Sequence, residues 1–306
     1  MTLPAYTPYD GSARLFTIGL GQLDPDRWIE PDDDLERYLA EKERVLAQHR
    51  DQVFVEEDGT RDAQAEVLAL VADFVTRHHP GRYRRDGEAI AVAHETATCR
   101  VRLDDPETPP LLTAGTLIQD DLVLMRRRET GWHLVAGYVS FPSSWSLPEK
   151  FGRRMEDIHA PVPDFGDGTR NAGLINRMFD NLPVERPVFR FNWSINPDAD
   201  LYYPASKAHG ALPSRHDLAL ERTFARVERQ TLRRLPLSGD ILFTIRIYND
   251  PLAAIRSLPN AAAVASTFAA QLEELTDPQA AYKGLVDKRA SLARLLRSQT
   301  PVDTAG

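Results

Sequence analysis

Residues 188–195 read VFRFNWSI, and this stretch decides the fold of the central part of the chain. Bulky apolar side chains fill every second position: Phe189, Phe191, Trp193 and Ile195. The positions between them hold Val188, Arg190, Asn192 and Ser194. Because a period of two puts alternate side chains on opposite faces of an extended chain, the pattern predicts a β-strand with one buried face. Residues 241–247 repeat this period after the turn residues Ser238-Gly239-Asp240.

Upstream of this strand, residues 122–125 and 132–141 predict two more strands that are joined by a short turn. A long insertion then spans residues 142–186, and it contains helical pieces at 147–159 and 174–182. The order is therefore strand, strand, helices, strand, strand, strand. It predicts an antiparallel sheet with helices over one face, which resembles a PAS-type module, and the expected fold class is α+β.

Helical patterns flank this core on both sides. One helix is expected to begin at Asp32-Asp33-Asp34, a second runs from about residue 62 to Pro80, and a third begins at Asp277-Pro278. We therefore expect three regions that form one compact unit. They are an N-terminal helical region packed on the core (1–110), the PAS-like core (111–250) and a C-terminal helical region (251–306).

The composition excludes several classes of function. The 306 residues include 37 Lys and Arg against 45 Asp and Glu, which gives a net charge of −8. Such an acidic chain lacks the basic surface that a nucleic-acid partner requires. The single cysteine, Cys99, rules out an intramolecular disulfide and a cysteine-based zinc or iron–sulfur site. With no secretion signal and no apolar run long enough to span a bilayer, we expect a cytoplasmic protein without a membrane partner.

His159 has the most distinctive surroundings of the eight histidines. It closes a short helical run and precedes Ala160-Pro161-Val162-Pro163, where two prolines stiffen the backbone and end the helix. A neutral imidazole on a rigid corner, near an aromatic sheet face, is suited to holding a metal or a haem iron. The alternative is a histidine that only caps the helix end, and spacing alone favours that alternative.

A cluster of arginines follows the central strand. Its members are Arg222, Arg226, Arg229, Arg233 and Arg234. Guanidinium groups bind carboxylates bidentately, so the cluster could hold an acidic ligand. The alternative, favoured by the cluster alone, is a solvated strand or helix face with salt bridges. In the same way, the aromatic face of residues 189–193 is more often plain core than the wall of a cofactor site.

Taken together, several runs of residues change this balance, because their order along the chain resembles that of the haem-dependent oxidative N-demethylase family. The runs are GWHLVA (131–136), FPSSW (141–145), EKFG (149–152), IHAPVP (158–163), FNWS (191–194), RVERQTL (226–232), LP (235–236) and AYKGL (281–285). Leu15-Phe16 and Trp28-Ile29-Glu30 are similar to the family's opening. The resemblance covers most of the chain, and its motifs are specific in combination.

The resemblance implies a PAS-like fold that has become catalytic and binds haem b, with its iron, without a covalent link. The implied activity is a monooxygenase reaction that uses dioxygen to remove an N-methyl group from a small secondary amine such as dimethylamine, releasing formaldehyde. Electrons are expected from a separate reductase protein that uses NADPH, flavin and an iron–sulfur centre. The single cysteine agrees with a reductase outside this chain.

The same resemblance gives roles to individual residues. We expect His159 to be the axial ligand of the iron, and Arg226 and Arg229 to neutralise the haem propionates. Phe191 or Trp193 is expected to line the macrocycle. Glu228 is a candidate for delivering protons or for holding an ammonium substrate, with a structural salt bridge to a neighbouring arginine as its alternative.

Three alternatives stay open at this point. Cys99 is the rival iron ligand, although a small buried apolar residue is the more common role for such a cysteine. The chain could be a haem-based PAS-like gas sensor, or a haem-free structural subunit of an oxidoreductase complex. Stoichiometric haem would argue against the structural subunit, and amine turnover that disappears in His159→Ala would separate an enzyme from a sensor.

Overall fold

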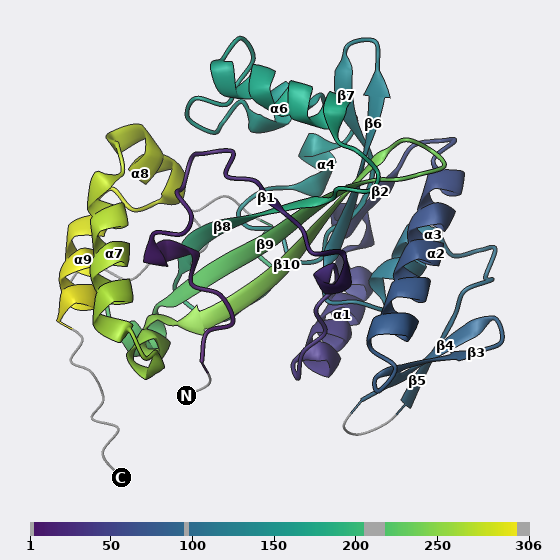
Figure 1. The fold of residues 1–306 in the computed structure, drawn as a ribbon, viewed down its shortest axis with the longest axis horizontal. Coiled ribbons are helices and arrows are strands. Elements are labelled where there is room, and N and C mark those ends of the chain that lie inside the picture. The colour runs from purple at the N-terminus through teal and green to yellow at the C-terminus, as the bar shows by residue number, and fades with distance from the viewer. Residues whose placement is uncertain (1–2, 95–97, 205–217, 299–306) are drawn as a thin grey trace.

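A computed structural model describes residues 3–94, 98–204 and 218–298, and its main feature is a seven-stranded antiparallel sheet (Figure 1). Its strands are β1 (Gly21–Gln22), β2 (Phe54–Glu56), β6 (Asp121–Arg128), β7 (Gly131–Tyr138), β8 (Val188–Asn196), β9 (Phe224–Arg234) and β10 (Ile241–Pro251). In space they follow the order β1, β8, β9, β10, β6, β7, β2. Together with the helices described below, this sheet confirms the α+β fold class.

The strand patterns of the central region are confirmed. β6 and β7 form the expected hairpin, while β8 and β10 lie where the alternating runs predict them. Four of the five arginines of the cluster lie in β9, which pairs with β8 on one side and β10 on the other and has mostly buried side chains. Only Arg222 is exposed, at the end of a short 3-10 helix (Leu220–Arg222) before the strand.

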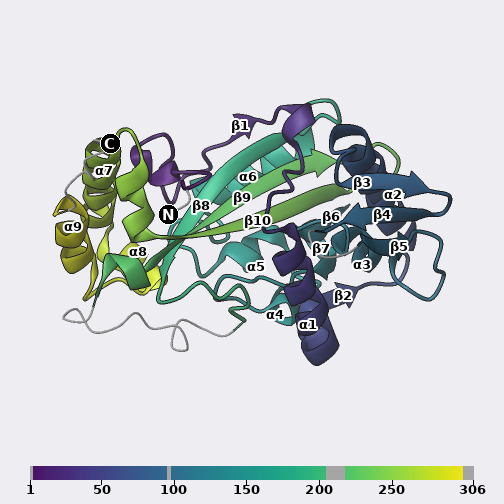
Figure 2. The same ribbon diagram turned by 90° about the horizontal axis from the view of Figure 1, so that it is seen from below.

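The alternation in β8 separates two different environments. On one face, Trp193 packs edge-on against Tyr9 and Phe268, and Phe191 packs against Tyr6. The other face carries the even-numbered residues and looks toward three short helices: α4 (Leu147–Lys150), α5 (Met155–His159) and α6 (Arg170–Asn181). Figure 2 shows α4 and α5 along one side of the sheet. Gly152, whose φ of +73° favours glycine, separates α4 from α5 within the single helical piece expected at 147–159.

From α1 onward the N-terminal region packs on the β6–β7 half of the sheet, whereas its first residues pair with β8 or pack on it. Its helices are α1 (Leu35–Val53), α2 (Arg61–His78) and α3 (Pro110–Gly115), whose apolar side chains share one core with Leu122, Leu124 and Val135. This region is not wholly helical, contrary to expectation. It also holds a three-stranded sheet made of β3 (Tyr83–Asp86), β4 (Ala89–Ala93) and β5 (Thr98–Arg102). The Asp86-Gly87 pair at the β3–β4 turn, with Gly87 at a φ of +59°, is a hairpin signal.

The C-terminal region gathers at the opposite end of the large sheet (Figure 1). It consists of α7 (Ala261–Glu274), α8 (Asp277–Lys283) and α9 (Arg289–Arg297). Thr276 and Gln279 form a capping box at the start of α8, and Gly284 ends that helix with a φ of +70°. Among the described residues, no helix has both the length and the apolar character needed to cross a bilayer.

Candidate functional site

A cavity of about 380 Å³ lies between α5 and α6 and the face of the sheet that carries the even-numbered residues of β8. This volume is in the range of small-molecule and cofactor sites. Its apolar walls include Met125, Leu134, Ile158, Phe165, Phe179 and Phe243. Many of its polar groups come from β8, β9 and the end of α8, and they include Arg190, Asn192, Glu228, Gln230 and Lys283. Lys150 and Lys288 add further charged groups to the lining. The cavity therefore combines apolar walls with a charged and polar sheet face.

His159 lines this cavity from the last position of α5. Its Nδ1 atom lies 2.9 Å from the carbonyl oxygen of Met155, which cannot donate, so Nδ1 carries the proton in this contact. The lone pair of the neutral ring is then on Nε2. Burial lowers the pKa of His159 below its ordinary value of 6.5, which favours this neutral form. The imidazole is thus prepared to act as an electron-pair donor.

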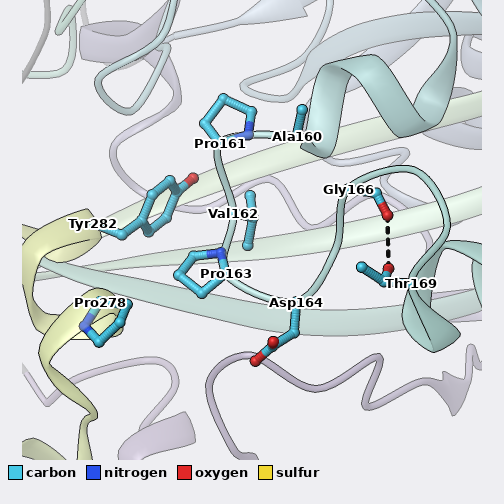
Figure 3. Close-up of a pocket in the computed structure, with 9 residues that line it drawn as sticks. All are labelled: Ala160, Pro161, Val162, Pro163, Asp164, Gly166, Thr169, Pro278 and Tyr282. Atoms are coloured by element: carbon cyan, nitrogen blue, oxygen red, sulfur yellow. Dashed lines mark hydrogen bonds between the residues drawn. The ribbon is translucent and has the colours of Figure 1, made fainter.

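The corner after His159 is held by backbone contacts. The Val162 N–H donates to the His159 carbonyl at 2.8 Å, and the Phe165 N–H donates to the Val162 carbonyl at 3.1 Å. Outside this corner lies a second pocket of about 490 Å³, toward which Tyr282 reaches from α8 (Figure 3). Val162 and Tyr282 line both pockets, so the cavity and the outer pocket meet at these two side chains.

Glu228 places a buried carboxylate in the same cavity. Its Oε2 atom accepts hydrogen bonds from Gln230 Nε2 at 2.7 Å and from Asn192 Nδ2 at 3.2 Å. Burial alone would raise the pKa of this carboxyl group. The hydrogen bond from Ser143, the charge of Lys283 and the bond from Asn192 outweigh burial and bring the pKa below its ordinary value of 4.5. Glu228 is therefore an anion at neutral pH.

Lys283 supports this anion from the last position of α8. Its Nζ atom donates to Asn192 Oδ1 at 3.0 Å and to the Trp193 carbonyl oxygen at 2.7 Å. Asn192 thus accepts from Lys283 with its oxygen and donates to Glu228 with its nitrogen, which fixes the orientation of the amide. The run AYKGL (281–285) contains this lysine, but the sequence predicts no role for it.

The two arginines expected at propionates have other partners. Arg226 is fully buried, does not line the cavity, and donates to Ser143 Oγ and to the carbonyl oxygens of Phe141, Asp200 and Leu201. Arg229 has the opposite parity in β9, bonds the carbonyl oxygens of Arg27 and Trp28, and lies 3.4 Å from Glu30. Both guanidinium groups are therefore used to hold the chain together.

The aromatic residues and the cysteine also lie away from the cavity. Phe191 and Trp193 stand on the other face of β8, where they pack against Tyr6, Tyr9 and Phe268. Cys99 is exposed on β5, in the separate three-stranded sheet. The cavity thus brings together His159 and Glu228 from the expected set, and not the other four residues or the rival cysteine.

Reasoning from the sequence missed four of the polar cavity residues named above: Arg190, Asn192, Gln230 and Lys283. The first two belong to the even-numbered set of β8, and the alternation itself identified that set. The signal in the sequence is Arg190 itself, a positively charged residue within a strand whose other face is aromatic. Within the described part of the chain, no three His, Cys, Asp or Glu side chains cluster closely enough to hold a metal ion.

Comparison with known protein families places most of the chain in one family. A family model described as haem-dependent oxidative N-demethylase, alpha subunit-like, matches residues 19–293, which include the whole large sheet and every cavity residue named above. The match extends from before β1 into α9. The chain therefore belongs to the haem-dependent oxidative N-demethylase alpha subunit-like family.

Proposed function

We propose that this chain is the haem-binding subunit of an oxidative N-demethylase that acts on a small secondary amine, such as dimethylamine, and releases formaldehyde. Family membership supports the proposal. The observation that carries it is the pairing of two groups in one cavity, the neutral imidazole of His159 and the buried carboxylate of Glu228. One suits an iron ligand, and the other suits a cationic substrate.

The residues of the cavity fit haem b. His159 would hold the iron through Nε2, and its hydrogen bond to Met155 fixes the tautomer that such a ligand needs. The walls formed by Phe165, Phe179 and Phe243 suit an apolar macrocycle. When bound, haem would supply iron-centred dioxygen chemistry.

The overall reaction would take up dioxygen, two electrons and two protons, and convert the N-methyl amine to the demethylated amine, formaldehyde and water. The two electrons would come from a separate reductase with NADPH, flavin and an iron–sulfur centre. In this reaction Glu228 would bind the protonated amine through its carboxylate and keep the N-methyl group inside the cavity. Because the pKa of Glu228 is lowered, this carboxylate is a weak base, so its proposed role is to hold the cation and not to take its proton.

We also propose that the sheet is PAS-like. The hairpin β6–β7, the helices α4 to α6 and the three strands β8 to β10 follow one another in the order on which the sequence resemblance relied. β10 pairs with β6, so the hairpin and the last three strands form one sheet, and one face of this sheet lines the cavity.

The test is the absorption spectrum of the purified protein after haem reconstitution, recorded oxidised, reduced and with carbon monoxide. We expect a Soret band at near-stoichiometric haem, a shift with carbon monoxide, and formaldehyde release from dimethylamine once a reductase is added. His159→Ala should lose the haem or change its spectrum, whereas His49→Ala should not, because His49 stacks on Tyr202 and does not line the cavity. A protein that binds no haem would refute the proposal.

A further inference from the structure

Arg190 lines the cavity from β8, and part of its hydrogen-bonding capacity has no partner among the residues that the structure describes. A guanidinium group has five N–H donors. Two of them are used, by Gln230 Oε1 at 3.1 Å and by the Thr17 carbonyl oxygen at 3.1 Å. The Nε atom is shielded from solvent and has no partner among the described residues.

The charge of Arg190 is also unpaired at short range. Within the described residues, no carboxylate oxygen lies within ion-pair distance of its guanidinium, whereas the buried Arg229 and Arg246 contact Glu30 and Asp32. Burial lowers the pKa of Arg190, and the charge of Glu228 only partly opposes this. A buried cation whose hydrogen-bond donors are only partly satisfied is costly unless a ligand completes its contacts.

Gln230 bridges Arg190 and the carboxylate of Glu228. Its amide nitrogen donates to Glu228 Oε2 at 2.7 Å, and its amide oxygen accepts from Arg190 at 3.1 Å. The amide therefore stands between the two charges and satisfies one side of each. The sheet face of the cavity presents an anion and a cation separated by one neutral side chain.

We propose that Arg190 binds a carboxylate group of a ligand in this cavity. Two ligands carry that chemistry. One is a propionate side chain of haem, in which case the inference rests on the proposed function. The other is the carboxylate of an N-methylated amino acid whose ammonium group pairs with Glu228. Either carboxylate accepts bidentate, charge-assisted hydrogen bonds from a guanidinium group.

Titration with haem and with haem dimethyl ester, whose propionates are uncharged, tests the first source. The proteins are the wild type, Arg190→Gln and the control Arg177→Gln, which replaces an exposed arginine of α6. If Arg190 holds a propionate, Arg190→Gln weakens haem binding by about 10- to 100-fold. It leaves binding of the dimethyl ester within about twofold. Arg190→Lys keeps the charge but loses the planar fork, so its haem affinity should lie between those of the wild type and Arg190→Gln.

Calorimetric titration with N-methylglycine and with dimethylamine tests the second source, on both the haem-loaded and the haem-free protein. If Arg190 holds a substrate carboxylate, Arg190→Gln weakens N-methylglycine binding by at least about tenfold and leaves dimethylamine binding unchanged. The inference is overturned if Arg190→Gln, with a circular dichroism spectrum and melting curve like those of the wild type, matches Arg177→Gln with every probe.

The haem-free arm separates this inference from the proposed function. A wild-type protein that binds no haem, but binds N-methylglycine in a way that depends on Arg190, would refute the haem proposal and support the carboxylate site. A wild-type protein that binds neither probe would overturn both.

Discussion

The Nδ1 atom of His159 lies 2.9 Å from the carbonyl oxygen of Met155, so the helix that carries the histidine also fixes its tautomer. The acceptor belongs to Met155, the first residue of α5, one helical turn before His159. The hydrogen bond holds the ring against its own helix and leaves Nε2 as the basic nitrogen. This orientation is compatible with the ligand role that the sequence offered.

The lowered pKa of His159 gives the haem-free protein a defined pH dependence. The folded chain resists protonation of this ring below its ordinary pKa of 6.5, while the unfolded chain does not. The unfolded state therefore binds more protons there, and stability falls as the pH drops below about 6.5. We expect His159→Asn to show a smaller fall in melting temperature than the wild type between about pH 7 and about pH 5. Parallel melting curves across this range would contradict the expectation.

Glu228→Gln tests the carboxylate as the amine-binding group. The amide keeps the size of the side chain and removes its charge, so haem content should be unchanged. We expect kcat/KM for dimethylamine to fall by about 100-fold, because a buried ion pair loses one partner. Glu149→Gln, on the exposed surface of α4, is the matched control and should behave as the wild type. Equal kcat/KM values in the two variants would remove Glu228 from the site.

If Glu228 binds the amine as proposed, Lys283 is expected to influence the acid limit of the activity through the pKa of Glu228. Its positive charge is among the causes that hold the pKa of Glu228 below 4.5. Lys283→Met should let that pKa rise, so the acid limb of the kcat/KM profile should move to higher pH. Lys283→Arg keeps the charge and should restore much of the shift. A profile that keeps its midpoint in Lys283→Met would show that Glu228 does not depend on this lysine.

The strands could be predicted from the sequence because their side chains alternate, but the face that meets the cavity could not. Both faces of β8 are covered in the structure. The aromatic face is packed by Tyr6, Tyr9 and Phe268, which come from the two ends of the chain. Periodicity separates the two faces of a strand, and only the tertiary contacts decide which one a distant segment fills. Phe191 and Trp193 were therefore expected on the cavity side, where Arg190 and Asn192 stand.

The arginine cluster also shows that tertiary contacts, and not the sequence pattern, decide which side chains are buried. Charge alone suggests a solvated strand, yet β9 lies between two other strands and buries Arg226 and Arg229. Their donors meet backbone carbonyl groups of distant loops, and no sequence pattern marks a carbonyl oxygen as an acceptor. His159 was recognisable because its signal is local, with two prolines following the histidine within four residues.

Two glycines should respond to alanine in opposite directions. A Cβ atom at Gly115, in α3, would overlap the ring of the buried Tyr138, whereas one at Gly173, in α6, would meet nothing within 4 Å. We expect Gly115→Ala to lower the free energy of unfolding by about 1–3 kcal/mol through overpacking. Gly173→Ala should raise it by about 0.5–1 kcal/mol, because alanine is the better helix former. Urea denaturation measures both, and a gain in stability at Gly115 would contradict the packing described around Tyr138.

A variant of Arg226 distinguishes between two roles of this side chain, a structural cation and a partner of a haem propionate. Its guanidinium donates to Ser143 Oγ at 2.8 Å and to carbonyl oxygens of Phe141, Asp200 and Leu201 at 2.8 to 3.2 Å. Arg226→Met would leave these buried acceptors without a donor, so we expect the free energy of unfolding to fall by about 3–5 kcal/mol. The fraction that still folds should bind haem within about twofold of the wild type. Wild-type stability combined with a loss of haem affinity of tenfold or more would instead return Arg226 to the role of a propionate partner, since only a ligand contact would then have been removed.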